Sequence, residues 1–257
     1  MIKNHNLTSF QTIARKETVR FLRIWPQTLL PSAITITLYY VIFGNLIGPR
    51  IGEMEGYSYI QFIVPGLTMM SVITNSYSNV VASFFSAKFQ RYIDELLVSP
   101  TSNSIILLGY ITGGIIRGTI IGVIVLFISI FFTDISINNF FITASVIFLT
   151  AVLFSLAGLT NGIFARKFDD VSIVPTFVLT PLTYLGGIFY SISMLPDFWR
   201  TLSQGNPILY MVNAFRYGML GHSDIEIYTA YTLIIGFIVA LYLINLYLLR
   251  KGIGIRT

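Results

Sequence analysis

Cysteine is absent from the 257 residues, and only 11% of the residues are charged. Without cysteine the chain holds no disulfide, no thiolate metal site and no cysteine nucleophile. Soluble domains are about 25% charged, so this chain has too few charges to cover a surface that faces water on all sides. A protein that is soluble in water alone is therefore excluded.

Histidine and the common catalytic motifs are also scarce. The two histidines, His5 and His222, stand far apart, and no GxxxxGK[ST], HExxH or GxSxG motif occurs. We therefore expect no metal site, no bound cofactor and no catalytic residue, and we expect that the chain is not an enzyme. The net charge of +5 does not indicate nucleic acid, because the basic residues flank apolar stretches, as topology signals do.

Long apolar stretches dominate what is present. Hydrophobic residues make up 54% of the chain, and the mean hydropathy is +0.76. At about 20 residues per membrane span, the sequence predicts an all-α membrane protein with one transmembrane domain over residues 1–257. Its six predicted spans are 28–47, 59–85, 104–132, 140–164, 172–192 and 228–249. Pro65-Gly66 is expected to interrupt the second span, and Pro175 and Pro181 to bend the fifth.

Two further segments are too polar to be clean spans. Residues 8–24 form a basic amphipathic pattern, which predicts a helix lying in the membrane interface. Its apolar side is expected to consist of Phe10, Ile13, Phe21 and Ile24. Residues 193–226 are semi-apolar and broken, which predicts short re-entrant or interfacial helices shielded by protein.

The distribution of basic residues predicts the topology. Six spans put both chain ends on one side, and positive charge concentrates on the cytoplasmic side. With both ends inside, the predicted cytoplasmic residues are Lys3, Arg15, Lys16, Arg20, Arg23, Lys88, Arg91, Arg166, Lys167, Arg250, Lys251 and Arg256. The outside then holds only Arg50, Arg200 and Arg216, while Arg117 lies within a span. Both termini are therefore predicted to be cytoplasmic.

The loop after the second span has helical character. Phe89, Ile93, Leu96 and Leu97 recur at helical spacing among the charged residues Lys88, Arg91, Asp94 and Glu95. A short amphipathic helix over 86–98 is consistent with two interpretations. It is a docking element whose apolar face enters a partner, or it is a connector that lies on the membrane.

The third span carries glycines four residues apart and one charge. Gly109, Gly113, Gly114 and Gly118 line a stripe on which another helix can approach closely. Arg117 either lines a substrate path or bonds to backbone carbonyls as a structural residue. No span holds an acidic residue near its middle, which argues against a proton-coupled carrier.

Three stretches together resemble the ABC-2 type membrane permeases. They are RYIDELLVSPTSNSIILLGYITGGIIRG (91–118), FDDVSIVPTFVLTPLTYLGGIFYSISMLP (168–196) and NPILYMVNAFRYGMLG (206–221). The first contains the Leu-Leu-x-Ser/Ala-Pro turn before a glycine-bearing span. The last contains Asn-Pro followed by an aromatic-Arg-aromatic cluster. The resemblance covers almost the whole chain.

This resemblance implies an exporter made of two permeases and two separate ATP-binding cassette ATPases in a bacterial inner membrane. ATP would then be used by the partner. Segment 86–98 would be the coupling helix, 8–24 the elbow helix, and 193–226 the outer helices that cap the pathway. Coupling is assigned by hypothesis to Phe89, Arg91, Asp94 and Glu95.

A second hypothesis assigns six residues to the substrate pathway or to the interface between permease subunits. They are Arg117, Gly109, Gly113, Gly114, Gly118 and Arg216. The transported substrate is not indicated by any of these residues. A secondary transporter or channel that needs no ATPase, and a membrane scaffold that transports nothing, are the alternative functions.

Overall fold

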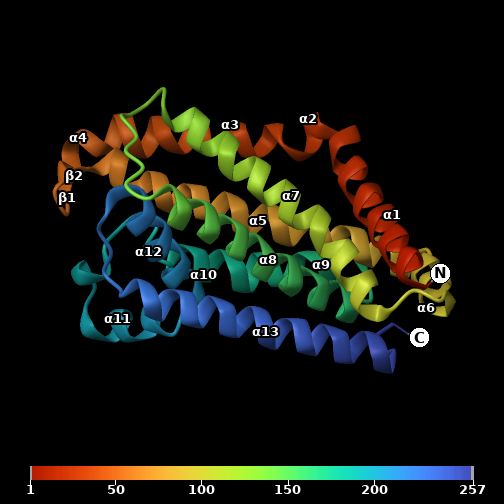
Figure 1. Cartoon of the computed structure of the whole chain (residues 1–257). Helices are drawn as coiled ribbons and strands as arrows, with labels where there is room; N and C mark the ends of the chain where they lie inside the picture. The colour runs from red at the N-terminus through yellow and green to blue at the C-terminus, as the bar shows by residue number, and fades with distance from the viewer. Residues whose placement is uncertain (1, 256–257) are drawn as a thin grey trace.

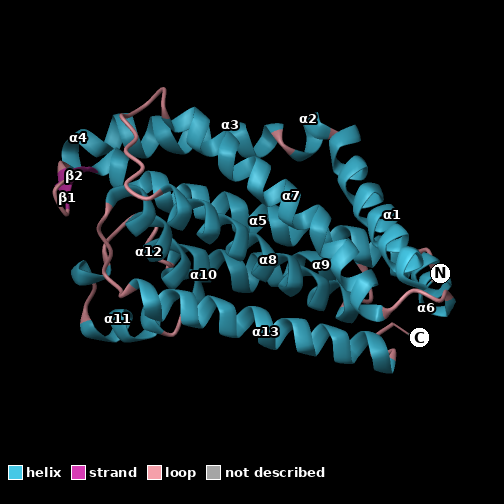
Figure 2. Cartoon of the chain, viewed as in Figure 1, coloured by secondary structure: helices cyan, strands magenta, loops and turns pink. Residues whose placement is uncertain are grey.

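The computed structural model describes residues 2–255 as a bundle of helices that run side by side along one long axis (Figure 1). Helix α6 (Tyr92–Val98) and both ends of the described chain lie at one end of the bundle, which we call the α6 end. The two-stranded hairpin of β1 (Glu53–Met54) and β2 (Tyr57–Ser58) lies at the other end, the hairpin end (Figure 2). Arg256, which is predicted to be cytoplasmic, lies outside the described residues.

The prediction of an all-helical chain is confirmed for the described residues, apart from the small hairpin. Four long helices are α5 (Tyr59–Phe89), α7 (Asn103–Ser129), α8 (Phe140–Phe164) and α13 (Ile227–Lys251). The first predicted span consists of α2 (Trp25–Thr28), α3 (Leu30–Tyr39), η1 (Tyr40–Ile47) and α4 (Gly48–Ile51). At the fifth, predicted over 172–192, the helical run comprises α9 (Phe168–Val174), η2 (Pro175–Leu179) and α10 (Thr180–Tyr184), so it starts and ends earlier than predicted.

Four stretches of the described chain are long and apolar enough to cross a membrane. They are Trp25–Ile51, Asn103–Ser129, Phe140–Phe164 and Ile227–Lys251. Helix α5 is long enough but carries many Ser, Thr and Asn residues, and the helical run of the fifth predicted span is short, from Phe168 to Tyr184. The count of six spans therefore stays a prediction.

Helix α5 occupies the centre of the bundle, between α7 and α8. It begins where Gln61 accepts a hydrogen bond from the Ser58 N–H at 3.2 Å, and it continues without interruption through Pro65. The expected break at Pro65-Gly66 is therefore wrong. Gly66 serves close packing instead, because a Cβ there would lie 2.7 Å from the Cα of Ile188.

The first and fifth predicted spans each contain a wider, π-helical segment. In the first it is η1, and Gly44 within it packs against Ile60 of α5. In the fifth it is η2, which begins at Pro175. Proline has no N–H to donate to the carbonyl four residues earlier, and the Asn161 side chain donates to that carbonyl, of Val171, at 3.3 Å. Irregular turns of this kind recur at functional sites.

The segment 193–226 forms short helices, as expected. They are η3 (Ile192–Met194), α11 (Asp197–Gln204) and α12 (Pro207–Leu220). Helix α12 packs against α5, α8 and α13 and is largely buried. Asn206 begins it by accepting the Ile208 N–H at 3.0 Å, and Gly221 ends it in the left-handed conformation with φ +77°.

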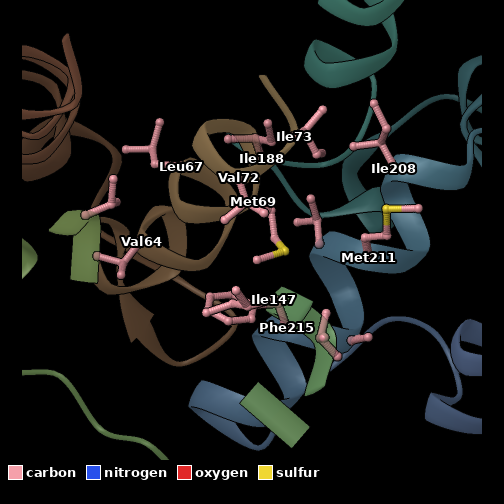
Figure 3. Close-up of a cluster of buried hydrophobic side chains, with 14 of the residues drawn as sticks. Val64, Leu67, Met69, Val72, Ile73, Ile147, Ile188, Ile208, Met211 and Phe215 are labelled. Atoms are coloured by element: carbon pink, nitrogen blue, oxygen red, sulfur yellow. The ribbon is translucent and has the colours of Figure 1, made fainter. Parts of the chain in front are cut away.

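A central core joins α5, α8 and α12. Figure 3 shows side chains from these helices meeting around Met69, Ile147 and Phe215. A second cluster lies nearer the α6 end, where Ile13, Tyr110 and Leu249 bring α1 (Ile2–Arg23), α7 and α13 together. The bundle thus has one apolar core toward each end.

The outer surface of the bundle is also apolar. Large side chains such as Phe127, Phe141 and Tyr228 are 61%, 84% and 83% exposed. Soluble monomers do not cover themselves with residues of this kind, whereas lipid-facing helices do. The chain is therefore a polytopic helical membrane protein.

Candidate functional site

The corner between α5 and α6 exposes the four residues assigned to coupling. Helix α5 ends at Phe89, and the chain turns through Arg91, which adopts the left-handed conformation with φ 63°. The predicted helix 86–98 is therefore divided, because its first residues belong to the last turn of α5. Phe89, Arg91, Asp94 and Glu95 are all exposed.

The apolar residues of α6 are used inside the chain. Ile93 is only 1% exposed, and Leu96 and Leu97 pack against the cluster at the α6 end. Of the four apolar residues expected on this face, Ile93 is thus unavailable to a partner and only Phe89 is largely exposed, and docking through α6 stays a prediction. What α6 offers to a partner is its charged side, together with Phe89 on the preceding turn.

A groove of about 890 Å³ lies beside α6. It is lined by Phe85, Lys88, Phe89, Arg91, Asp94, Phe164, Arg166, Gly254 and Ile255. Three of these residues, Phe85, Phe89 and Phe164, are aromatic, and the Phe168 ring packs 5.0 Å from both Phe85 and Phe89 between ring centroids. The groove thus combines an aromatic surface with charged residues at its edge.

The basic residues of this groove differ in what they bind. The Lys88 ammonium donates to the carbonyls of Ile163 and Ala165 at 2.6 and 2.7 Å, which closes the last turn of α8. Partial burial, with a smaller contribution from Arg166, lowers the pKa of Lys88. Arg91 and Arg166, in contrast, form no side-chain ion pair with the described residues, so their charges remain available to a partner.

The turn at 166–170 joins α8 to α9 and carries charges of both signs. The Asp170 carboxylate accepts the backbone N–H groups of Arg166 and Lys167 at 2.8 and 3.0 Å. These hydrogen bonds hold the pKa of Asp170 below its ordinary value. Asp170 therefore caps α9 and leaves the two basic side chains free of an ion pair with it.

A second groove, of about 190 Å³, opens between α3, α5 and α10. It is lined by Tyr39, Met70, Thr74, Ser78, Pro175, Leu179, Thr180, Thr183 and Tyr184. None of these residues is charged, and six carry a hydroxyl group. On α5 the exposed or half-exposed side chains recur every fourth residue as Met70, Thr74, Ser78 and Ala82, while most of the remaining helix is buried. We call this the hydroxyl groove.

An aromatic cluster lies beside the hydroxyl groove. Phe189 lies 4.9 Å from Phe43, 6.0 Å from Tyr39 and 6.2 Å from Tyr184, measured between ring centroids. Two of these rings, Tyr39 and Tyr184, also line the groove. The hydroxyls of Thr74, Ser78, Thr180 and Thr183 and these rings thus form one continuous surface.

The glycine stripe of α7 lies inside the single chain. A Cβ at Gly109 would lie 2.6 Å from Ile13 of α1, and one at Gly113 would lie 2.7 Å from Glu17 of α1. A Cβ at Gly114 would lie 2.8 Å from the Ser76 carbonyl of α5. Gly118 also approaches Ser76. These glycines bring α7 close to α1 and α5, and their role in a pathway or dimer interface stays a prediction.

Both arginines assigned to the pathway are engaged with their own chain. Arg117 donates to the Thr28 carbonyl at 2.8 Å and to the Asn75 side chain at 3.0 Å. Arg216 is 1% exposed, donates to the Gly187 carbonyl at 2.7 Å and lies 4.0 Å from the centroid of the Phe62 ring. Arg216 is therefore buried within its own chain, and its placement on the outer side and a transport role for either arginine stay predictions.

Sequence reasoning missed the hydroxyl groove. Thr74 and Ser78 are spaced four apart between Met70 and Ala82, but other Ser and Asn residues of α5 lie among them, so the spacing alone does not single out the groove. The sequence did not predict which other segments line the groove beside α5. Thr180 and Thr183 come from a segment about 100 residues further along the chain, and only the fold brings them to α5.

The chain is similar in sequence to known proteins. The profile of the ABC-2 type transporter family matches residues 8–220. The inner membrane transport permease YadH of Escherichia coli (strain K12) is 57% identical over 249 residues, which cover 97% of both chains. Nodulation protein J of Neorhizobium galegae is 23% identical over 250 residues, which cover 95% of this chain and 94% of that protein. This helical membrane protein therefore belongs to the ABC-2 type transporter family, as its three motif stretches predicted.

Proposed function

We propose that this chain is the permease subunit of an ATP-binding cassette exporter whose ATP is hydrolysed by a separate ATPase. Membership in the ABC-2 type transporter family supports the pairing with an ATPase. The similarity to an inner membrane transport permease supports a place in a bacterial inner membrane. In this arrangement the α6 end, with both termini, faces the cytoplasm, in keeping with its excess of Lys and Arg.

The observation that carries the proposal is the exposed charge of α6. Its apolar residues already pack against the bundle, so α6 is held firmly while Arg91, Asp94 and Glu95 face outward. The adjoining groove adds Phe89 and Arg166. A surface with an aromatic centre and charges around it is typical of a protein interface, and we assign it to the ATPase.

The hydroxyl groove is our candidate for the transport pathway. An open polar stripe at the middle of a membrane helix is unfavourable against lipid, so we infer that a second copy of the chain covers it. Two facing grooves would then enclose a path between the copies of a homodimer. Movement of α6 acts directly on this path, because α5 continues from the groove to the α6 corner.

The alternative functions make different demands on the chain. A secondary transporter or channel requires no ATPase, and a scaffold requires no pathway. The hydroxyl groove counts against a scaffold. Transport that proceeds in reconstituted vesicles without ATP would favour the secondary transporter.

Reversing the charges of Asp94 and Glu95 to lysine tests the docking surface. Both side chains are exposed, so we expect the permease to fold normally. We expect the amount of co-purifying ATPase to fall by more than about tenfold, since like charges facing each other at an interface cost several kcal/mol. The measurement is co-purification in mild detergent, with Mg-ATP hydrolysis identifying the partner.

Glu53→Lys provides the matched control, because Glu53 is an exposed acid at the hairpin end. It should leave the bound ATPase unchanged. A double variant at Asp94 and Glu95 that retains its ATPase in full would show that α6 is not the docking element.

A further inference from the structure

Helix α1 buries a carboxylate on the side that faces the bundle. Ile13, Glu17 and Phe21 recur at intervals of four and are 6%, 0% and 0% exposed. The expected apolar side is therefore only partly right, because Glu17 lies within it and Ile24 is 42% exposed. A helix that only lies in the membrane interface keeps its charged groups on the side that faces water.

Glu17 is bonded to the central helix α5. The Ser83 hydroxyl donates to Glu17 Oε2 at 2.5 Å, and Arg20 Nε lies 3.3 Å from the same oxygen. Arg20 extends the contact, since its Nη2 donates to both the carbonyl and the side-chain oxygen of Asn79 at 3.0 Å. Glu17 of α1 thus binds Ser83 of α5, and Arg20 binds Asn79, which lies one turn earlier in α5.

Helix α7 is shaped to admit this cluster. Gly113 faces Glu17 and Asn79, and a Cβ at this position would lie 2.7 Å from the Glu17 Cβ. The glycine therefore allows the Glu17 side chain to be enclosed by three helices, while the Arg20 side chain stays 34% exposed. Any larger residue at position 113 would separate α7 from α1.

The same side of α5 carries a further polar residue that bonds to neighbouring helices, one turn before Asn79. Asn75 lies four residues before Asn79, and it accepts from Arg117 of α7 at 3.0 Å and donates to Ser32 of α3 at 3.0 Å. Asn75, Asn79 and Ser83 thus form a polar row that bonds α5 to α1, α3 and α7.

Stability alone is a weak explanation for this cluster. Burying the Glu17 carboxylate costs much of what its attraction to Arg20 returns, and Glu17 Oε1 has no hydrogen-bond partner among the described residues. What such a pair does supply is a fixed geometry between the elements it joins. A clamp between α1 and α5 matters in a transporter whose α5 ends at the docking corner.

We propose that Glu17, acting through Arg20 and Ser83, is a positioning residue that makes α1 move as one body with α5 and α7. This inference rests on the proposed coupling at α6. A displacement of α6 then reaches α1 and α7 through the polar row as well as along α5. Without the clamp, α6 would still move α5, but α1 would no longer follow.

The first test concerns the clamp in the permease by itself. We expect Glu17→Gln to speed hydrogen exchange of the α1 amides by about tenfold or more, as the loss of one charge-assisted hydrogen bond predicts. Exchange in α13 should not change. Thr18→Val is the control, because the Thr18 hydroxyl bonds only to Ala14 within α1. Unchanged exchange of α1 in Glu17→Gln would overturn the proposal.

The second test asks whether α1 follows α6. The chain lacks cysteine, so single cysteines at the exposed positions Gln90 and Val19 carry spin labels without background. In the permease purified with its ATPase, ATPγS should change the spectra of both labels. With Glu17→Gln added, only the label at position 90 should respond, whereas a response at both positions would overturn the clamp.

These outcomes separate the clamp from the proposed function. If neither label responds to ATPγS in the otherwise unchanged chain, the ATPase coupling through α6 is wrong. The hydrogen-exchange result then decides by itself whether Glu17 holds α1 to the bundle.

Discussion

Single glycines set how closely the helices of this bundle approach one another. Gly158 of α8 lies directly against α5, where a Cβ would be 2.5 Å from the Tyr77 carbonyl oxygen and 3.3 Å from its Cα. Backbone atoms cannot rotate away as a flexible side chain can. We expect Gly158→Ala to push α8 from α5 and to destabilise the fold by about 1–3 kcal/mol, the usual cost of overpacking. Thermal unfolding in detergent measures this loss.

Gly236 of α13 is the matched control for Gly158. It is also in the interior of a long helix, but nothing lies within 4 Å of the position where a Cβ would stand. Gly236→Ala should therefore leave stability unchanged or raise it by up to about 1 kcal/mol, the difference in helix propensity. Equal melting temperatures for the two variants would show that contact between α5 and α8 does not depend on Gly158.

At the scale of elements, Asp170 fixes the start of α9. Its carboxylate accepts two backbone N–H groups, and its pKa is held below the ordinary value. The stabilisation is therefore fully present above the unfolded-state pKa of about 3.9 and is lost as the pH falls through the lower folded-state pKa. We expect Asp170→Ala to speed hydrogen exchange at Arg166 and Lys167 at neutral pH, and this difference should vanish in acid.

Asp169→Ala supplies the comparison for this cap. The neighbouring Asp169 contributes its backbone carbonyl, which accepts from Ser172 at 2.8 Å, and alanine retains that carbonyl. Exchange at Arg166 and Lys167 should therefore match the unsubstituted chain at every pH. An equal effect of both substitutions would mean that general charge near α9, rather than the Asp170 cap, protects the turn.

The elements were predictable where one local rule governs them. Apolar runs located α7, α8 and α13 to within a few residues, because each is a long uninterrupted helix. Prediction was wrong where tertiary contacts decide. Pro65 does not break α5, and the neighbouring Gly66 packs closely on Ile188. Arg91 adopts the left-handed conformation and divides the predicted 86–98 helix, and no local sequence pattern predicts this conformation.

The candidate sites were predictable only in part for the same reason. Exposure of Phe89, Arg91, Asp94 and Glu95 follows from local charge and spacing. In contrast, Glu17 has the sequence character of an exposed residue among Arg15, Lys16 and Arg20, and it is buried only because Ser83 and Gly113 meet it across the bundle. Sequence patterns of one helix do not reveal a partner that is about 70 residues away.

At the scale of the whole molecule, α5 connects every feature assigned to transport. One side bears the hydroxyl groove, another bears the polar row that binds α1, α3 and α7, and its last turn leads into α6. The outer helices, in contrast, expose large apolar side chains. The central position of α5 makes it the element through which an event at the α6 end can alter the membrane groove.

Water access to α5 tests this arrangement. Thr74 is the middle residue of α5 and lines the hydroxyl groove, whereas Val239 is the middle residue of α13 and is 50% exposed on an apolar helix. In vesicles, a membrane-impermeant maleimide should label Thr74→Cys and should not label Val239→Cys, because the charged reagent reaches water-filled paths and not lipid.

Nucleotide should also change the labelling of Thr74→Cys. If closure of the ATPases moves α6 and hence α5, ATPγS should alter the labelling rate at position 74 while position 239 stays unlabelled. The chain has no native cysteine, so any signal reports the introduced thiol. Labelling of both positions would indicate general loosening of the bundle in the vesicle. Protection of position 74 under all conditions would mean that the groove faces lipid or protein, and the pathway would then have to lie elsewhere in the bundle.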